Sequence, residues 1–281
     1  MTVLMRNIRL IVSYDGTDFF GWQRQPEVPT IQGAIETAIE KITTEKVTLS
    51  GSGRTDTGVH ALNQVANFKT AGAIPCENLL KALNNVLPQS VRIKKVEDVA
   101  ESFHARHDAR SKTYRYRILC RPVASPFIAR FVHHYPFPLD FERMAAGARC
   151  LEGEHDFTSF AASPDVEGRA QVPIADVSGI KSAFAVSHPD SRLPTPHSRS
   201  CVRTIFSSRI LWRPRTSILA YEVRGSGFLH HMVRNIVGTL LEVGRGKIPP
   251  QDVRAILEAR DRTQAGPTAP ASGLCLINVE Y

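Results

Sequence analysis

Segments with the period of a β-strand and segments with the period of an α-helix follow one another in a similar order in both halves of this chain of 281 residues. Residues 8–14 alternate apolar and other side chains, as in a half-buried strand, and a helix with apolar spacing over 31–42 is expected to begin at Pro29-Thr30. Further elements are expected as strands at 47–49, 64–68 and 91–96 and as a helix at 79–87 that stops before Pro88. This mixed order predicts an α+β half over residues 1–109.

Residues 110–281 show the same kind of order without a visible repeat of the sequence itself. A strand at 113–120 is expected to place Tyr114 and Tyr116 on one face and Arg115 and Arg117 on the other. The remaining elements are expected as a helix capped by Asp140, strands at 202–212 and 217–224, an amphipathic helix at 227–243, a helix near 250–260 and a strand at 273–280. We therefore expect two halves that are alike in kind.

A glycine-rich loop, residues 51–61, carries a carboxylate beside a guanidinium. Gly53 and Gly58 surround Arg54 and Asp56, and glycine permits backbone angles and close approaches that other residues do not. The loop lacks the third glycine of a dinucleotide-binding loop and the lysine of a phosphate-binding P-loop. Its own sequence leaves two interpretations open: a site that presents Asp56 to a ligand, or a tight turn in which Asp56 caps a helix.

Composition restricts the class of protein. Lys and Arg number 35 and Asp and Glu 27, and the net charge of +8 favours a polyanionic partner. The five cysteines are far apart and form no Cys-x-x-Cys pair, so neither a disulfide framework nor a zinc site is expected. They are typical of reduced thiols in the cytoplasm. The chain has no cleavable apolar leader and no apolar run of membrane-spanning length, so we expect a cytoplasmic protein with no membrane partner.

Cations gather between His104 and Arg117, and two tyrosines are interleaved with them. The cations are Arg106, Arg110, Lys112, Arg115 and Arg117, against the single acid Asp108. A basic run with aromatic residues is typical of a nucleic-acid surface, although strand edges also carry Lys and Arg to prevent aggregation. The pairs His133-His134 and His230-His231 lack metal-ligand spacing with a carboxylate, so no metal is expected and both pairs are interpreted as surface or RNA-facing residues.

Six motifs, in order along nearly the whole chain, resemble those of the tRNA pseudouridine synthase A family. Residues 51–61 resemble the catalytic loop of that family. The other motifs are Tyr14-Asp15-Gly16-Thr17 with residues 21–25, then residues 103–106 with 112–116, 156–160, 228–238 and 273–276. The resemblance implies the pseudouridine synthase fold: two similar α/β halves that share a central mixed, mostly antiparallel sheet, with the active-site cleft between them.

Residues 163–200 depart from the family pattern. In the family, the position of Phe160 is followed much sooner by the block that Arg203-Thr204-Ile205 resembles. The segment holds five prolines and little periodicity, and connections of this length are uncommon inside compact domains. We interpret it as an insertion, either a flexible surface loop or an arm that contacts RNA. Support for the arm is limited to Arg192, His197 and Arg199.

The resemblance assigns catalytic roles to three side chains. Asp56 matches the family nucleophile, and Arg234 matches its charge partner, since a nearby arginine favours an ionised carboxylate. Tyr114 matches the aromatic residue that stacks on the flipped uracil, and its hydroxyl is a candidate for removing the C5 proton.

Substrate binding is expected to involve four residues. Arg54 matches the family residue that enters the space left by the flipped base, because a base inside folded RNA must leave its stack. Tyr114 stacks on that base. Arg106 and Lys112, from the basic run, are expected to contact the RNA.

The implied reaction converts uridine to pseudouridine at positions 38, 39 and 40 of the tRNA anticodon stem-loop, by a homodimer whose two subunits hold one tRNA. The reaction moves the bond at ribose C1′ from N1 to C5 of uracil and oxidises nothing, so it needs no redox cofactor and no metal. The alternatives are the same reaction at another RNA position, an inactive RNA-binding relative, or a nucleoside hydrolase. A hydrolase commonly uses two carboxylates, whereas this loop offers only Asp56.

Overall fold

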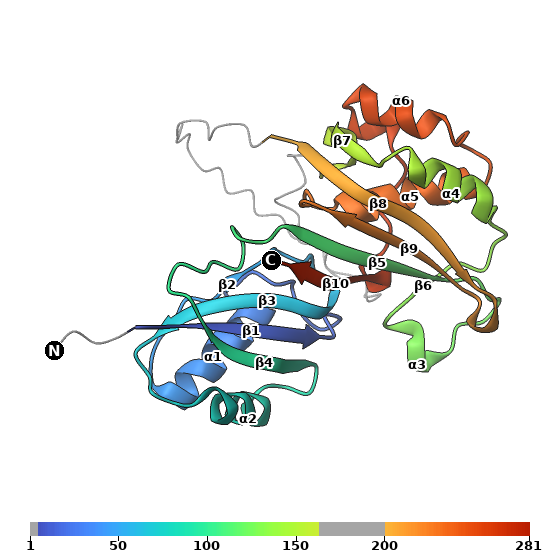
Figure 1. Ribbon diagram of the computed structural model, residues 1–281. Coiled ribbons are helices and arrows are strands. Elements are labelled where there is room, and N and C mark those ends of the chain that lie inside the picture. The colour runs from blue at the N-terminus through green and yellow to red at the C-terminus, as the bar shows by residue number, and fades with distance from the viewer. Residues whose placement is uncertain (1–4, 163–199) are drawn as a thin grey trace, which may run out of the picture.

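The computed structural model describes residues 5–162 and 200–281 (Figure 1). The predicted insertion at 163–200 lies, apart from Ser200, outside the described residues.

The first half contains the elements that the sequence predicts, with one exception. They are β1 (Arg6–Tyr14), α1 (Ile31–Thr43), β2 (Ser50–Gly51), β3 (His60–Thr70), α2 (Cys76–Val86) and β4 (Val91–Val99). Helix α1 begins where expected because the Gly33 N–H donates to the capping Thr30 Oγ1 at 3.3 Å. The strand expected at 47–49 is wrong. The Leu49 N–H donates to the Glu36 carboxylate at 2.9 Å, so side chains of α1 satisfy the backbone there.

The second half contains ten elements in its described residues, besides short 3₁₀ turns. They are β5 (Ser111–Leu119), α3 (Pro126–Ala129), β6 (His133–His134), α4 (Phe141–Arg149), β7 (Gly153–Asp156), β8 (Val202–Arg213), β9 (Ile218–Gly225), α5 (Met232–Gly244), α6 (Asp252–Ala259) and β10 (Leu274–Glu280). Asp140 caps α4 as predicted, since its carboxylate accepts from the Arg143 N–H at 2.9 Å.

Helix α5 differs from the prediction in its start and in its environment. It begins at Met232 instead of residue 227, because the preceding His231 has a left-handed backbone with φ of 58°. It is buried on nearly every side and is not amphipathic in its packing. Its polar residues are hydrogen-bonded inside the protein; Thr239 Oγ1, for example, donates to the Asn235 carbonyl oxygen at 2.9 Å. The turn at 225–227 therefore leads into a loop and not directly into a helix.

One sheet runs through both halves. Its strand order is β4-β1-β3-β10-β5-β9-β8-β7, with β2 also paired to β3 and β6 to β5. Only the pairs β10–β3 and β5–β6 are parallel among the described strands. The prediction of an α+β fold with a mixed, mostly antiparallel sheet is confirmed. Figure 1 shows that β3, β10 and β5 join the two halves in the middle of the molecule.

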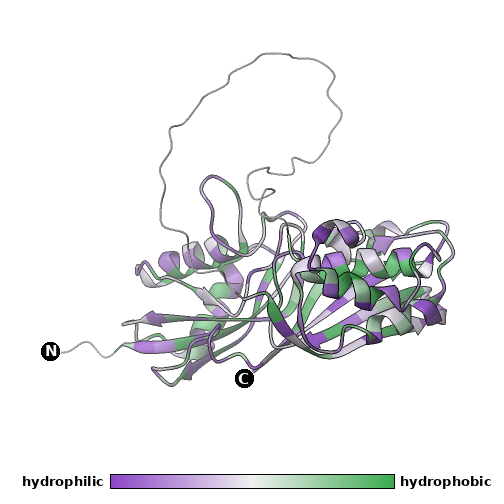
Figure 2. Ribbon diagram, turned by 90° about the horizontal axis from the view of Figure 1, so that it is seen from above, coloured by the Kyte–Doolittle hydropathy of each residue, from purple (hydrophilic) through white to green (hydrophobic). Residues whose placement is uncertain are grey.

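The main hydrophobic core lies between the sheet and the helices. Figure 2 shows the larger helices of both halves on the same side of the sheet. The face of β5 that carries Tyr114, Tyr116 and Ile118 points into this core, as the alternation predicts. Within the described part of the chain, no helix combines the length and the apolar character needed to cross a membrane.

Candidate active site

Asp56 lies in the turn between β2 and β3, and contacts on both sides fix the loop that carries it. The Trp22 N–H donates to the Thr55 carbonyl oxygen at 3.0 Å, and the Tyr14 hydroxyl lies 2.8 Å from Thr55 Oγ1. Gly21 has φ of 83°, and a Cβ there would lie 2.6 Å from the Thr55 carbonyl oxygen, so the position requires glycine. The helix-cap interpretation of Asp56 is wrong because the strand β3 follows the turn.

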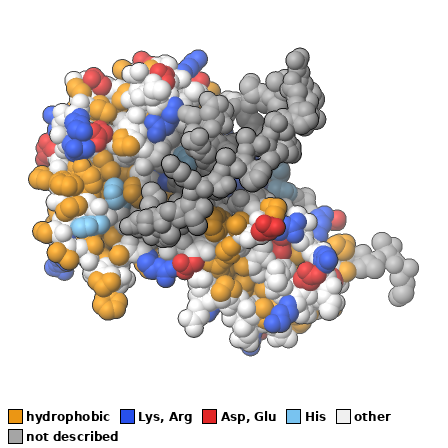
Figure 3. Space-filling model, turned by 180° about the vertical axis from the view of Figure 1, so that it is seen from behind, with side chains coloured by type: hydrophobic (Ala, Val, Ile, Leu, Met, Phe, Trp, Pro, Cys, Tyr) orange, Lys and Arg blue, Asp and Glu red, His pale blue; other side chains and the backbone are white. Residues whose placement is uncertain are grey.

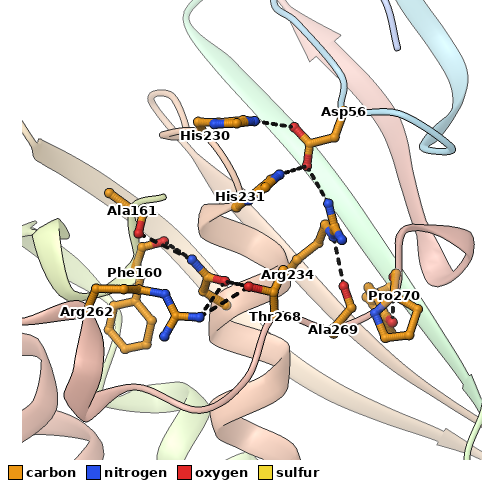
Figure 4. Close-up of polar contacts among 12 residues, drawn as sticks. Asp56, Phe160, Ala161, His230, His231, Arg234, Arg262, Thr268, Ala269 and Pro270 are labelled. Carbon is orange, nitrogen blue, oxygen red and sulfur yellow. Dashed lines mark hydrogen bonds and ion pairs between the residues drawn. The ribbon is translucent and has the colours of Figure 1, made fainter. Parts of the chain in front are cut away.

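Arg234, on the first turn of α5, reaches Asp56 from the other half of the chain. Its Nη1 donates to Asp56 Oδ2 at 3.1 Å, and its Nε donates to the Ala269 carbonyl oxygen at 2.8 Å (Figure 4). Arg234 is 8% exposed, and the Asp56 side chain is 17% exposed. Two bonds hold the guanidinium in one orientation, with its positive charge beside the carboxylate.

The residue after Arg234 holds this turn of α5 in place. Asn235 Nδ2 donates to the Phe160 carbonyl oxygen at 2.8 Å. Its Oδ1 accepts from Thr268 Oγ1 at 2.7 Å and from Arg262 Nη2 at 3.1 Å. The side-chain amide therefore ties α5 to two further segments of the chain, and the orientation of Arg234 follows from those contacts.

Tyr114 lies on β5, in the core beside the carboxylate. It is 7% exposed, and its ring packs edge-on against Phe228 with centroids 5.1 Å apart. Burial raises the pKa of the Tyr114 hydroxyl, and the charge of Asp56 adds to that effect. The hydroxyl consequently keeps its proton at neutral pH.

Lys112 lies beneath the catalytic-type loop. Its Nζ donates to the Ser52 carbonyl oxygen at 2.6 Å, and a Cβ on Gly53 would lie 2.9 Å from that nitrogen. Burial lowers the pKa of Lys112 to about 8, and the charges of Arg106 and Arg203 lower it further. The structure thus gathers three cations at the base of the loop, of which Arg203 was not predicted as a site residue.

Arg54 occupies the exposed side of the same loop. Its Nε donates to Gln23 Oε1 at 3.2 Å. Asp56, two residues later, points inward and is half-buried. The two side chains therefore face different environments.

Comparison with known proteins agrees with this geometry. The sequence profile of the tRNA pseudouridine synthase family matches residues 10–108 and 187–281. A protein named tRNA pseudouridine synthase A from Solibacter usitatus is 47% identical over 279 residues, which cover 99% of this chain and 100% of that protein. Proteins of the same name from Brevibacillus brevis and Caldicellulosiruptor saccharolyticus are 43% and 41% identical, with the same coverage.

The chain belongs to the tRNA pseudouridine synthase family. Membership makes it an isomerase and confirms the resemblance carried by the six sequence motifs. The nucleoside hydrolase alternative is thereby set aside.

His230 and His231 were missed as neighbours of the carboxylate. His230 Nε2 lies 3.6 Å from Asp56 Oδ1, and His231 Nε2 lies 3.7 Å from Asp56 Oδ2 (Figure 4). The pair has no carboxylate at metal-ligand spacing along the sequence, but the fold brings one to it from the other half of the chain. The signal that was available is its place in the synthase motif, three and four residues before Arg234.

These three donor residues lie close enough together to be tested as a metal site, since the ligand atoms fall within 4.8 Å of one another. Arg234, however, already donates to Asp56 Oδ2 at 3.1 Å. A divalent ion at the carboxylate would lie beside that positive charge, which opposes its binding. We therefore do not identify Asp56, His230 and His231 as metal ligands.

Proposed function

We propose that this synthase converts uridine to pseudouridine at positions 38, 39 and 40 of the tRNA anticodon stem-loop, with Asp56 as the nucleophile. The observation that carries the proposal is the contact of Asp56 with Arg234 at 3.1 Å. A guanidinium at that distance places a positive charge beside the carboxylate and orients it for attack on C1′. Covalent catalysis by a carboxylate divides the transfer of C1′ from N1 to C5 into easier steps.

Tyr114 and Arg54 are suited to handle the flipped base. Extrusion of a base from folded RNA costs a few kcal/mol, which stacking on an aromatic ring and filling of the vacated space offset. The Tyr114 ring is held by Phe228 beside the carboxylate. The exposed Arg54 is free to exchange its single side-chain bond to Gln23 for contacts with RNA.

The cations below the loop are suited to bind the RNA backbone. The positive charges of Arg106 and Arg203 lie close enough to Lys112 to lower its pKa. Phosphates neutralised by such a group release counterions, so binding of tRNA should weaken steeply with salt.

A homodimer is supported by exposed apolar surface on the second half. Figure 3 shows hydrophobic side chains gathered on the surface of the second half. Val123, Phe127 and Phe137 are 79%, 91% and 63% exposed. Apolar patches of this kind mark association surfaces. Light scattering on the parent and on Phe127→Asp tests this: a dimeric parent and a dissociated variant are expected, and a monomeric parent contradicts it.

The proposal also includes a chain organised in two halves and a cytoplasmic location. Residues 1–109 and 110–281 form the two halves, supported by the sheet order, in which β4, β1 and β3 come from the first half. Cys76, Cys120, Cys150 and Cys275 are free thiols, which suits a cytoplasmic protein.

Position-resolved mapping of pseudouridine tests the function. Parent enzyme incubated with unmodified tRNA transcripts is expected to form pseudouridine at positions 38, 39 and 40, and Asp56→Asn is expected to form none while still binding tRNA. Product at other positions would favour the alternative of another RNA site. Turnover by Asp56→Asn within about tenfold of the parent would remove Asp56 from the nucleophile role, since loss of a nucleophile costs far more.

A further inference from the structure

We propose that the imidazole of His231 removes the proton from C5 of the re-attached uracil and returns it to N1. The proposal rests on the proposed function, because it takes Asp56 as the group at which the base is detached. It adds a catalytic residue outside the set of Asp56, Arg234 and Tyr114.

The position of His231 is the first support. Its Nε2 lies 3.7 Å from Asp56 Oδ2, and its ring stacks on that of His230 with centroids 3.9 Å apart. The two rings thus border the carboxylate to which C1′ must come. His231 is 23% exposed, so it is enclosed by protein on most sides and open on the remainder.

The backbone at His231 is the second support. Its φ of 58° is uncommon for a residue with a side chain, and such conformations gather at functional sites. The His231 carbonyl oxygen accepts from the Asn235 N–H at 2.9 Å, which joins this residue to the first turn of α5. The same turn orients Arg234, so the imidazole and the guanidinium are positioned together.

The balance of the reaction defines what the base must do. Once C5 has bonded to C1′, the ring carries a hydrogen at C5 and a double bond between N1 and C6. The C5–H electron pair must become the C5=C6 double bond, and the N1=C6 pair must move to N1, which takes a proton. C5 and N1 both adjoin C6, so one imidazole can accept the first proton and deliver it to the second atom.

The surroundings keep His231 neutral until that step. The groups that face it are Asp56, Arg234, His230 and Arg262. Burial lowers its pKa, and the two arginines and His230 lower it further, against the opposite effect of Asp56. A neutral imidazole has a free lone pair. When C5 holds C1′, Asp56 is again a free carboxylate and stabilises the imidazolium that forms.

The neighbouring candidates are less well placed to accept the proton. The buried Tyr114 hydroxyl retains its proton, because burial raises its pKa. Asp56 Oδ2 already accepts from Arg234 Nη1 at 3.1 Å, so a lone pair of this oxygen is engaged. His230 is 51% exposed and therefore less well positioned than His231.

The test is single-turnover kinetics of His231→Gln on tRNA that carries either hydrogen or deuterium at C5 of uridine. We expect the rate constant to fall by roughly 10²-fold or more, the size of a lost general base, with tRNA affinity unchanged. We also expect a larger deuterium isotope effect than in the parent, because breakage of the C5–H bond becomes limiting. His155→Gln, at a histidine of the edge strand β7, is the matched control and should match the parent.

Two outcomes would overturn the proposal: a parental rate in a folded His231→Gln, or a slowed variant without an increased isotope effect. The second would indicate a structural role only. Circular dichroism establishes that the variant is folded, and His231→Asn serves if it is not. Asp56→Asn, assayed in parallel, separates the two proposals. Retained activity in Asp56→Asn contradicts the nucleophile role of Asp56. Loss of activity in Asp56→Asn together with parental activity in His231→Gln contradicts only the role of His231 as the base.

Discussion

Arg234 and Asp56 are 178 positions apart in the chain, and their side chains meet at 3.1 Å. The contact spans the two halves of the molecule, since Asp56 precedes β3 and Arg234 lies on α5. It depends on the guanidinium being held from behind by the Ala269 carbonyl oxygen at 2.8 Å. A positive charge alone would not reproduce this arrangement.

Arg234→Lys should therefore lower turnover by about 10²-fold, the size of a lost oriented donor, although the charge is kept. A lysine offers one compact ammonium and cannot bond Ala269 and Asp56 with two separate nitrogens. Single-turnover assays on tRNA measure the effect. Arg254→Lys, at an ion pair with Glu258 on α6, is the control. A single-turnover rate in Arg234→Lys equal to that of the parent enzyme would show that a positive charge at this position is sufficient without the second bond.

Binding of tRNA should weaken as the pH rises through about 8. The pKa of Lys112 is lowered to about 8, so its ammonium is present below that pH and is lost above it. Lys112→Arg keeps a charge throughout and should bind with little pH dependence over the same range. Lys112→Gln should reduce the slope of log affinity against log salt by about one at neutral pH. Filter binding measures both, and identical pH profiles for the parent and Lys112→Arg would contradict the role.

Arg54→Ala should impair stem uridines more than loop uridines. The unpairing cost is lowest where the base is already partly unstacked, so help with flipping matters most in the stem. Transcripts that each carry one target uridine separate the sites. Equal losses at stem and loop sites would remove Arg54 from flipping.

Tyr114→Phe should keep most activity, and Tyr114→Leu should lose a substantial part of it. The phenylalanine retains the ring that packs on Phe228, whereas the leucine removes a stacking surface worth roughly 1–3 kcal/mol per base. The buried hydroxyl holds its proton and is not required as a base. A Tyr114→Phe enzyme that detaches uracil but stalls before product would instead assign proton removal to this hydroxyl.

The fold was largely predictable because most strands and helices have side chains that alternate between core and solvent. The prediction of an amphipathic helix failed at α5, because its side chains show no such contrast between core and solvent. In α5, buried polar residues such as Asn235 and Thr239 are bonded internally, so sequence pattern and packing differ. Apolar Phe228 and Leu229 continue the helical spacing towards the N-terminus, yet His231 has a left-handed backbone, so the helix begins only after it.

The residues of the site could be predicted only where they match motifs of the family. Asp56, Arg234 and Tyr114 stood out by their place in the family pattern. The histidine pair lies in the same motif as Arg234, but its contact with a carboxylate was hidden, because Asp56 is more than a hundred positions away and adjacency arises only when the halves meet. Arg203 was likewise hidden, since it lies on β8, two strands from β5 in the sheet, and only the fold brings its charge near enough to lower the pKa of Lys112.

Strand β10 lies between β3 and β5 and is the strand through which the two parts of the sheet are joined. Asp56 and Arg234 lie on opposite sides of this junction. A site built on their contact therefore exists only while β10 holds the two parts of the sheet together.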